Sequence, residues 1–485
     1  MFDVDGAYQQ LTQISKKDYF DIIRLTVRSS DIFVFPEKRS LVPRTRFPVT
    51  GREVVLRTET DTCPSISYVG GYHTTSMPSQ EPCQSVSDKN LLVLSHRYNT
   101  FTKSQIDELA RYYDHIYVLV RHNLLAELAA KVDSNTYNTL TYSRRVVPET
   151  PRNVTVETTN LIYLPLKTVY RNLDWYHSTV VLKQLRKIEL EFDIVHAHFT
   201  WTAGAAGVAV AEELDVPCVL TAHEDTNRLL SELRSDRPVE DVWERASAII
   251  RVNEQDVDIL REYCDDVRYV PNGFDRDRFP DLKRDEARSE LGIPLETPVI
   301  YSLGHLNERK GHVDLIAAVD RMERDAMCVI SGEGELKSRL QERITERDLD
   351  DQVLLTDYVS DTVAALWMNA CDVFVLPSYA EGTPTVLFEA LGCGKPYVGT
   401  DVGGVDEIIT SSDYGLLYEP GDVSSLATLL DEAIGIEWSE DQIKSYASNF
   451  DWETISKDIL AVHEDVLSRH SDSMPKDRQE TDQSI

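Results

Sequence analysis

Short apolar runs alternate with longer amphipathic stretches along most of the chain from residue 90 onward. Residues 91–94, 116–120 and 373–376 are unbroken apolar runs, which are typical of strands buried on both faces of a parallel sheet. Stretches between such runs, for example 103–112, place their apolar residues at the spacing of one helix face. Strands that alternate with helices in this way predict an α/β fold.

One strand–loop–helix–strand unit, at residues 372–407, contains most of the predicted chemistry. Its first strand, 373–376, ends at a proline, and Thr383 followed by Pro384 predicts an N-cap and the first residue of a helix. Glycines and a proline within 392–396 predict the end of that helix. The loop and the helix start follow the carboxyl end of a strand, which is where open α/β sheets bind their ligands.

The start of this helix has the features of an anion site. Backbone N–H groups from residue 382 to residue 386 lack intrahelical partners, and the helix dipole favours negative charge there. The dipole contributes only about 0.3–1 kcal/mol, so a diphosphate also needs cationic side chains. Glu381 and Glu389 flank the site, and carboxylates suit sugar hydroxyls, which donate hydrogen bonds to them. The alternative is that both glutamates are solvated surface residues of an acidic chain.

The spacing of Glu381 and Glu389 resembles the E-x7-E signature of the retaining GT-B glycosyltransferases of family 4. In that family the first glutamate contacts the donor sugar and the second holds the ribose of the nucleotide. The resemblance implies a GT-B fold, in which two Rossmann-like domains face a cleft. It also implies transfer of a sugar from a nucleotide-sugar donor to a hydroxyl acceptor, with retained anomeric configuration and by a front-face mechanism.

Residues 304–311, with the sequence GHLNERKG, resemble the family's GRLxxxKG loop. The arginine and lysine of that loop neutralise the donor diphosphate. Lys310 matches the lysine, whereas His305 stands at the arginine position. We therefore expect either that His305 donates a neutral hydrogen bond or that Arg309 supplies the missing charge.

Residues 194–223 resemble the family's VHAHF…VPxVxTxH region, which places His223 at the acceptor side of the active site. His196 and His198 are interpreted as mainly structural. The exit of the strand near Val359 corresponds to a segment that contacts the base in family members. The predicted catalytic residues are therefore His223, Lys310 and Glu381. The predicted nucleotide-sugar-binding residues are Gly304, His305, Lys310, Val359, Glu381, Gly382, Thr383, Pro384, Thr385 and Glu389.

The chain departs from the family in the loop 96–101, where many members have glycines that let backbone amides approach the donor phosphate. Amides near Thr100 or the side chain of Arg97 would have to replace them.

Asp275 and Asp277 form a D-x-D, which binds a divalent metal in GT-A enzymes. These aspartates lie in the expected interdomain turn and are interpreted as structural. We expect no metal and no cofactor, with the nucleotide sugar as co-substrate.

The expected domain order has five parts. They are an N-terminal extension at 1–88 whose fold the pattern does not indicate, a Rossmann-like acceptor domain at 89–273, a Rossmann-like donor domain at 274–448, a helix at 449–470 that crosses back to the first domain, and a disordered tail at 471–485. In the extension, 16–27 is predicted as a helix, and 32–35 and 54–56 as strands. Its five arginines within 39–57 are either solvated or a contact for anionic lipid or phosphate.

The formal net charge of −32 changes this picture in one respect. The acidic residues are spread along the chain, which indicates a surface adapted to concentrated salt, as in halophilic archaea, and which disfavours nucleic-acid binding. The seven cysteines show no C-x-x-C spacing; five are predicted to be buried thiols, and a disulfide between Cys63 and Cys83 is disfavoured by a reducing cytosol.

The expected location is the cytoplasm, because the chain shows neither a signal peptide nor an apolar run long enough to span a membrane. Residues 170–190 combine basic and aromatic side chains. They predict either a helix packed on the sheet with solvated charges or a peripheral contact with the inner membrane face. The expected partners are a nucleotide-sugar donor and a glycan or lipid-linked acceptor.

Three rival functions stay open at this point. A sugar-nucleotide-binding pseudoenzyme would explain His305 and the missing glycine loop, and would bind the donor without turnover. A glycoside hydrolase would use Glu381 and Glu389 as an acid–base pair and would need no nucleotide. A sugar-nucleotide epimerase on the same fold would form product without an acceptor. The sequence does not name the base, the sugar or the acceptor.

Overall fold

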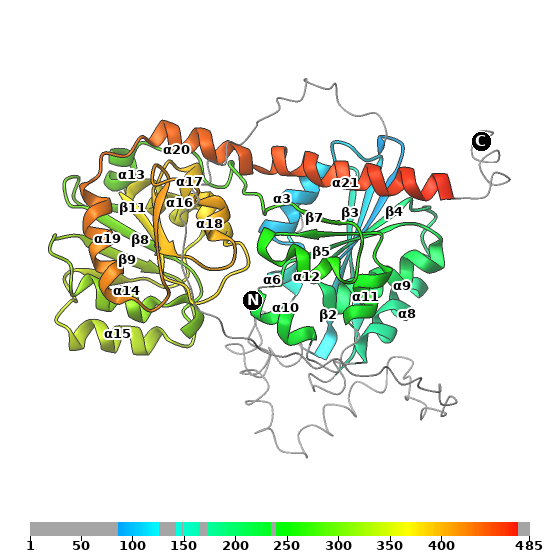
Figure 1. Cartoon of the computed structure of the whole chain (residues 1–485), viewed down its shortest axis with the longest axis horizontal. Coiled ribbons are helices and arrows are strands. Elements are labelled where there is room, and N and C mark those ends of the chain that lie inside the picture. The colour runs from blue at the N-terminus through cyan, green and yellow to red at the C-terminus, as the bar shows by residue number, and fades with distance from the viewer. Residues whose placement is uncertain are drawn as a thin grey trace, which may run out of the picture. The chain divides into compact units, whose positions relative to one another are not determined.

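The computed structural model describes residues 86–125, 142–147, 149–163, 172–224, 226–233 and 239–473 of the 485-residue chain (Figure 1). The predictions for the N-terminal extension up to residue 85, including its helix, strands, arginine cluster and cysteines, lie outside the described residues. The tail from residue 474 also lies outside them. No helix of the described part is both long enough and apolar enough to cross a bilayer.

The first sheet has seven parallel strands in the order β3-β2-β1-β4-β5-β6-β7. The strands are β1 Asn90–Ser95, β2 His115–Asn123, β3 Val154–Leu161, β4 Ile194–His198, β5 Cys218–Ala222, β6 Ala248–Arg251 and β7 Val267–Tyr269. Strands β2 and β3 extend the sheet on one side of β1, and strands β4 to β7 extend it on the other side, so the strand order reverses between β1 and β4. Open α/β sheets form their ligand crevice at such a switch point, outside the carboxyl ends of the strands.

Helices cover both faces of this sheet. They are α3 Thr100–Leu109, α6 Tyr142–Arg145, α8 Leu173–Leu185, α9 Ala205–Leu214, α10 Thr226–Leu233, α11 Val239–Arg245 and α12 Val257–Arg261, with shorter turns at η3 Thr200–Gly204 and η4 Glu254–Asp256. Apolar side chains of α8, α9 and α11 pack on one face, and those of α3 pack on the other. The strands are therefore apolar on both sides, as their unbroken hydrophobic runs predict.

The second sheet has six parallel strands in the order β10-β9-β8-β11-β12-β13. The strands are β8 Val299–Leu303, β9 Met327–Ser331, β10 Val353–Leu355, β11 Val373–Leu376, β12 Tyr397–Thr400 and β13 Gly415–Tyr418. Its switch point lies between β8 and β11, and the loops that follow these two strands are those with the family-like motifs. The expected two-sheet α/β architecture is thus confirmed (Figure 1).

Helices also cover both faces of the second sheet. They are α13 Arg284–Leu291, α14 His312–Val319, α15 Lys337–Glu346, α16 Asp361–Ala370, α17 Thr385–Gly392, α18 Val405–Ile408, α19 Val423–Gly435 and α20 Glu440–Ala447, with turns at η5 Glu308–Lys310 and η6 Ser448–Phe450. Side chains of α16 and α17 pack on one face, and those of α14, α15 and α19 pack on the other. The five described cysteines are buried and free, as predicted.

The last helix, α21 Trp452–Ser473, packs on the first sheet although it follows the second sheet in sequence. Trp452, Ile455 and Ile459 join the same core cluster as the α3 side chains. Backbone hydrogen bonds hold the start of this helix to the turn at Phe274: the Phe274 N–H donates to Phe450 O at 3.0 Å, and the Trp452 N–H donates to Phe274 O at 3.2 Å. Helix α21 therefore brings residues from the C-terminal end of the chain beneath strands β4 and β5.

Some predicted boundaries differ from the structure. The strand whose exit is predicted near Val359 ends earlier, at Leu355; the Thr356 N–H still donates to Ile330 O at 2.9 Å, and residues 357–360 form no strand. The basic helix predicted within 170–190 spans Leu173–Leu185, and its buried residues include Val181 and Leu185. This helix packs on the sheet, which supports the first of the two interpretations given above without excluding a contact through its outer face.

Candidate functional site

Two loops meet at the carboxyl edge of the second sheet, one after β8 and one after β11. The Tyr379 N–H donates to Arg309 O at 2.7 Å and so joins them. Gly311 has a φ of 66°, and a Cβ there would lie 1.8 Å from Pro377 O. Only glycine fits this position, because a side chain would collide with backbone that cannot yield. The glycine of the predicted loop is therefore required for the close approach of the two loops.

Glu381 lies at the centre of this contact and is only 6% exposed. Its two oxygens pair with separate cations: Lys310 Nζ lies 2.6 Å from Oε1, and Arg309 Nη1 lies 3.0 Å from Oε2. Burial by itself would raise the pKa of Glu381, but the charges of Lys310 and Arg309 outweigh it and the pKa is lowered. Glu381 is therefore an ionised, buried carboxylate held between two cations.

Glu389 lies within α17 and is 4% exposed. Its Oε1 accepts from Arg278 Nη1 at 2.8 Å, and Arg278 also pairs with Asp361 at 2.8 Å. Burial raises the pKa of Glu389 to about 7, with Arg278 opposing the rise and Asp361 adding to it. The two glutamates of the predicted motif are both buried, so the interpretation that they are solvated surface residues is wrong.

Of the two residues considered for the second positive charge, Arg309 is the one that lies beside Lys310 at Glu381. Much of the His305 side chain is exposed to solvent. The part of the ring that is buried lowers its pKa below the usual histidine value, so the ring is neutral near pH 7. Arg309, in contrast, reaches both the Glu381 carboxylate and the carbonyl of Ala380, the latter at 2.6 Å. The structure therefore favours Arg309 over His305 as the second positive charge beside Lys310.

The helix start at 383–385 differs in one respect from the prediction. Helix α17 begins at Thr385 with Pro384 as the N-cap residue, and no side chain caps it. The Thr383 hydroxyl, predicted as the cap, donates instead to Val252 O at 2.6 Å. A tertiary hydrogen bond to the carbonyl of a buried residue has thus replaced the local one. The N–H groups of the first turn of α17 are left without a side-chain cap.

His223 lies just after β5, at the edge where the first sheet meets α17. A Cβ on Gly382 would lie 3.4 Å from His223 O. The Asn272 side chain hydrogen-bonds to the His223 ring, and its Nδ2 donates to Thr383 O at 3.1 Å. His223 is thus placed within a few ångströms of the glutamate loop. His196 and His198, interpreted as mainly structural, are both fully buried.

The other predicted residues are placed as follows. Gly304 lies beside Lys310, because a Cβ on it would be 3.6 Å from Lys310 Cε. Val359 is half-buried against the core of the second sheet, and its contact with a base stays a prediction. In the glycine-poor loop, the Tyr98 N–H donates to Arg145 O at 2.7 Å, and burial lowers the pKa of Arg97.

The sequence did not identify Arg278 or Asn272 as site residues. Arg278 pairs with Glu389 across 111 positions of sequence, and Asn272 contacts Thr383 across the same separation. The only signal for Arg278 was indirect: a buried carboxylate needs a cationic partner, and this residue lies in the turn that joins the two sheets. Asp275, in the same turn, accepts hydrogen bonds from Ser104 and from the N–H of Asp277, as expected of a structural residue.

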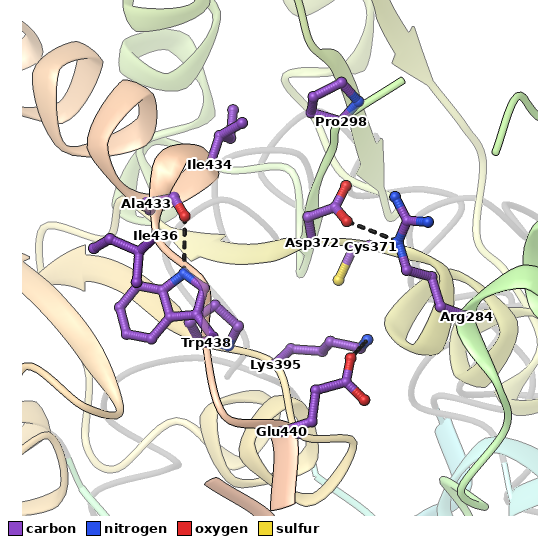
Figure 2. Close-up of a pocket in the computed structure, with 12 residues that line it drawn as sticks. Arg284, Pro298, Cys371, Asp372, Lys395, Ala433, Ile434, Ile436, Trp438 and Glu440 are labelled. Atoms are coloured by element: carbon purple, nitrogen blue, oxygen red, sulfur yellow. Dashed lines mark hydrogen bonds and ion pairs between the residues drawn. The ribbon is translucent and has the colours of Figure 1, made fainter. Parts of the chain in front are cut away.

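A cavity of about 300 Å³ lies at the opposite, amino edge of the second sheet (Figure 2). Its charged side chains pair with one another: Arg284 with Asp372 and Lys395 with Glu440, each at 2.8 Å. The cavity is therefore separate from the Glu381 site. In the described ranges, no three histidine, cysteine, aspartate or glutamate side chains gather in a way that could hold a metal ion.

Two parallel sheets, each with its ligand edge at a switch point, and a cation-bound glutamate at one of these edges are the arrangement expected of a GT-B glycosyltransferase. The model of the Glycosyltransferase Family 4 domain matches residues 122–278, and that of Glycosyl transferases group 1 matches residues 283–450. The chain belongs to the family 4 glycosyltransferases and is an enzyme that transfers sugar from a nucleotide-sugar donor.

Relatives of known assignment agree with this family. The chain is 29% identical over 255 residues to the protein assigned as the teichuronic acid biosynthesis glycosyltransferase TuaC of Bacillus subtilis, a match that covers 52% of this chain and 63% of that protein. It is 26% identical over 390 residues to the D-inositol 3-phosphate glycosyltransferase of Xylanimonas cellulosilytica, which covers 73% of this chain and 92% of that protein.

Solved structures share the fold. Sucrose-phosphate synthase from Thermosynechococcus elongatus aligns with a TM-score of 0.62 at 18% identity, covering 79% of this chain and 100% of that one. Anabaena Alr3699/HepE in complex with UDP-glucose aligns with a TM-score of 0.56 at 21% identity, covering 77% and 99%.

Proposed function

We propose that this enzyme is a retaining, metal-independent glycosyltransferase whose donor diphosphate binds between Lys310, Arg309 and the start of α17. The observation that carries the proposal is the pair of cations on buried Glu381. Lysine has three N–H donors and arginine has five, so each keeps donors for phosphate while it holds the carboxylate. Together with the uncapped N–H groups of α17, they supply the charge that stabilises a departing nucleoside diphosphate.

In this proposal Glu381 orients the donor sugar through its hydroxyls, and Glu389 holds the ribose. His223 lies on the acceptor side. A UDP-sugar is the first donor to test, because HepE binds UDP-glucose on the same fold. Two relatives are named for teichuronic acid biosynthesis and for D-inositol 3-phosphate, respectively. We accordingly propose a polyhydroxyl acceptor, either a growing glycan or a lipid-linked sugar.

The test measures turnover of UDP-, GDP- and ADP-glucose by the wild type and by Glu381→Gln, with and without EDTA. We expect Glu381→Gln to lower kcat about 10²-fold, because the sugar loses a charge-assisted hydrogen bond and Lys310 loses its partner. EDTA should leave the rate unchanged. NMR of the product should show the anomeric configuration of the donor. Full turnover by Glu381→Gln, or an inverted product, would refute the proposed role or stereochemistry.

The assays should include concentrated salt, because we propose that the acidic surface is an adaptation to it. Self-repulsion of a chain with net charge −32 is screened over about 10 Å at 0.1 M salt and over about 3 Å at 1 M. We therefore expect activity to rise between about 0.1 M and about 2 M KCl.

We also propose a peripheral membrane contact through the outer face of α8. Trp175 is 61% exposed on this helix, and Lys183 and Arg186 are exposed on it as well. Replacing Trp175 with serine and Lys183 with glutamate should reduce cosedimentation with vesicles that contain about one-third phosphatidylglycerol. Lys283→Glu, at an exposed lysine beside the second sheet, is the control. Equal binding by both variants would contradict the proposal.

A further inference from the structure

A continuous column of histidines lies along one face of the first sheet and ends at His223. Along β4, His196 and His198 lie on the same face of the sheet, because successive side chains alternate. On the neighbouring strand β5 and the residue that follows it, Thr221 and His223 share that face, and His198 is paired in register with Thr221. Helix α21 covers this face and contributes His463, which is fully buried. We call His463, His196, His198 and His223 the histidine column.

Hydrogen bonds and two ring stacks, His196 on His198 and His198 on His223, connect the column. His463 Nε2 lies 3.1 Å from His196 Nδ1, and the other side of the His463 ring is held by the Tyr113 hydroxyl at 2.8 Å from Nδ1. The His196 ring in turn hydrogen-bonds to Thr221 through Nε2 at 2.7 Å. It also stacks on the His198 ring, with centroids 4.6 Å apart and planes within 19°.

The last link fixes the proton position at the active site. His198 Nδ1 lies 3.0 Å from His223 Nε2. Asn272 donates through Nδ2 to Thr383 O, and its side chain also hydrogen-bonds to the His223 ring and raises the pKa of that ring, as an amide oxygen that accepts from a ring N–H does. Because His223 Nε2 faces His198, we assign the Asn272 contact and the proton to Nδ1 of His223, so the donor at the His198 link is the Nδ1–H of His198. This leaves His198 Nε2 as an unprotonated, buried atom, and it has no hydrogen-bond partner among the residues that the structure describes.

All four rings are neutral. Burial lowers the pKa of His463 to about 3 and that of His198 to about 4, and it lowers those of His196 and His223 well below the usual value. Neutral imidazoles have one donor and one acceptor, so the orientation and tautomer of each ring depend on its neighbours. The column is therefore suited to holding a ring in place.

We propose that His463 is a positioning residue for His223, acting through His196 and His198. The hydrogen bond from His463 keeps the His196 ring from rotating. The His198 ring packs on the His196 ring, and His198 in turn donates to His223. The C-terminal helix thus contributes to the geometry of the acceptor side, although it touches no substrate. This inference rests on the role of His223 in the proposed function.

The test compares four variants of the whole chain. His463→Leu removes both hydrogen bonds at similar volume, whereas His463→Gln keeps a donor and an acceptor. Val466→Ala is the matched control, because it removes packing from the same buried face of α21 and leaves the column intact. His223→Phe tests the target residue. Each is assayed for thermal stability, for kcat and KM on the nucleotide sugar turned over fastest among UDP-, GDP- and ADP-glucose, and by NMR of the labelled imidazole nitrogens.

We expect wild-type NMR to show His198 and His223 as single Nδ1-protonated tautomers, and His463→Leu to mix these tautomers. The same variant should lower kcat about tenfold with KM for the donor unchanged, because small displacements of a reacting group cost one to two powers of ten. His463→Gln should recover part of the loss, and Val466→Ala should lower only thermal stability.

Two results would overturn the inference in distinguishable ways. If His463→Leu behaves like Val466→Ala, with unchanged tautomers and kcat, while His223→Phe is inactive, the positioning role is wrong and the proposed function stands. If His223→Phe retains full kcat, the role proposed for His223 is itself wrong, and the positioning role is overturned with it.

Discussion

Replacing Lys310 with methionine is expected to lower kcat/KM for the nucleotide sugar by about 10²–10³, the usual cost of losing one preorganised donor to developing negative charge. Lys310 is 9% exposed and is held 2.6 Å from Glu381, so its ammonium group is fixed before the donor arrives. A methionine keeps most of the volume and removes the charge. Arg309 remains but also serves the Ala380 carbonyl, so it cannot fully replace the lysine.

The matched control is Lys395→Met. Lys395 is 3% exposed and paired with Glu440, but it lines the cavity at the other edge of the same sheet (Figure 2). The Lys395→Met enzyme should be less stable than the wild type and should keep the wild-type kcat/KM. Because Lys310→Met leaves Glu381 buried beside a single cation, the double variant with Glu381→Gln should recover stability, and the catalytic effect of losing the lysine is read from its kcat/KM relative to that of Glu381→Gln alone. A Lys310→Met enzyme within a few-fold of the wild type and of Lys395→Met would show that this lysine does not stabilise the leaving group.

The sequence predicted the two loops that meet around Glu381 because their information is local. Glu381, Glu389 and the cations at 309–310 lie in short segments whose glycines and strand ends determine the backbone path. Gly311 illustrates this, since its left-handed conformation and its close approach to Pro377 both follow from a turn that only glycine tolerates. The fold class was predictable for the same reason: buried parallel strands appear as unbroken apolar runs.

The sequence could not predict contacts between distant segments. Thr383 has the local pattern of an N-cap, yet its hydroxyl donates to Val252, 131 positions earlier. His463 looks like one polar residue on an amphipathic helix, and only the packing of α21 on β4 brings it to His196, 267 positions away. Such pairings depend on which helix covers which face of a sheet. No spacing within one segment contains that information.

Nucleotide-sugar binding is expected to weaken by up to about tenfold between about pH 8 and about pH 6, because Glu389 titrates in that interval. Its pKa is raised to about 7, so the carboxylate is ionised above this pH and protonated below it. The ionised form is the better acceptor for ribose hydroxyls. Binding should therefore be strongest on the alkaline side. A diphosphate esterified at both ends, as in UDP-glucose, does not itself titrate in this range, so calorimetry with that ligand reports the protein group.

Two substitutions separate Glu389 from other titrating groups. Glu389→Gln should bind about 10–100-fold more weakly at pH 8, as a charge-assisted hydrogen bond is lost, and should lose the pH dependence. Asp361→Asn leaves Glu389 in place but removes the carboxylate that raises its pKa and shares Arg278. Removing the negative charge of Asp361 and leaving Arg278 to Glu389 alone both lower the pKa of Glu389, so the midpoint of the binding curve should move to lower pH. If Glu389→Gln keeps the wild-type pH dependence, the titrating group is elsewhere, and the ribose contact assigned to this glutamate is wrong.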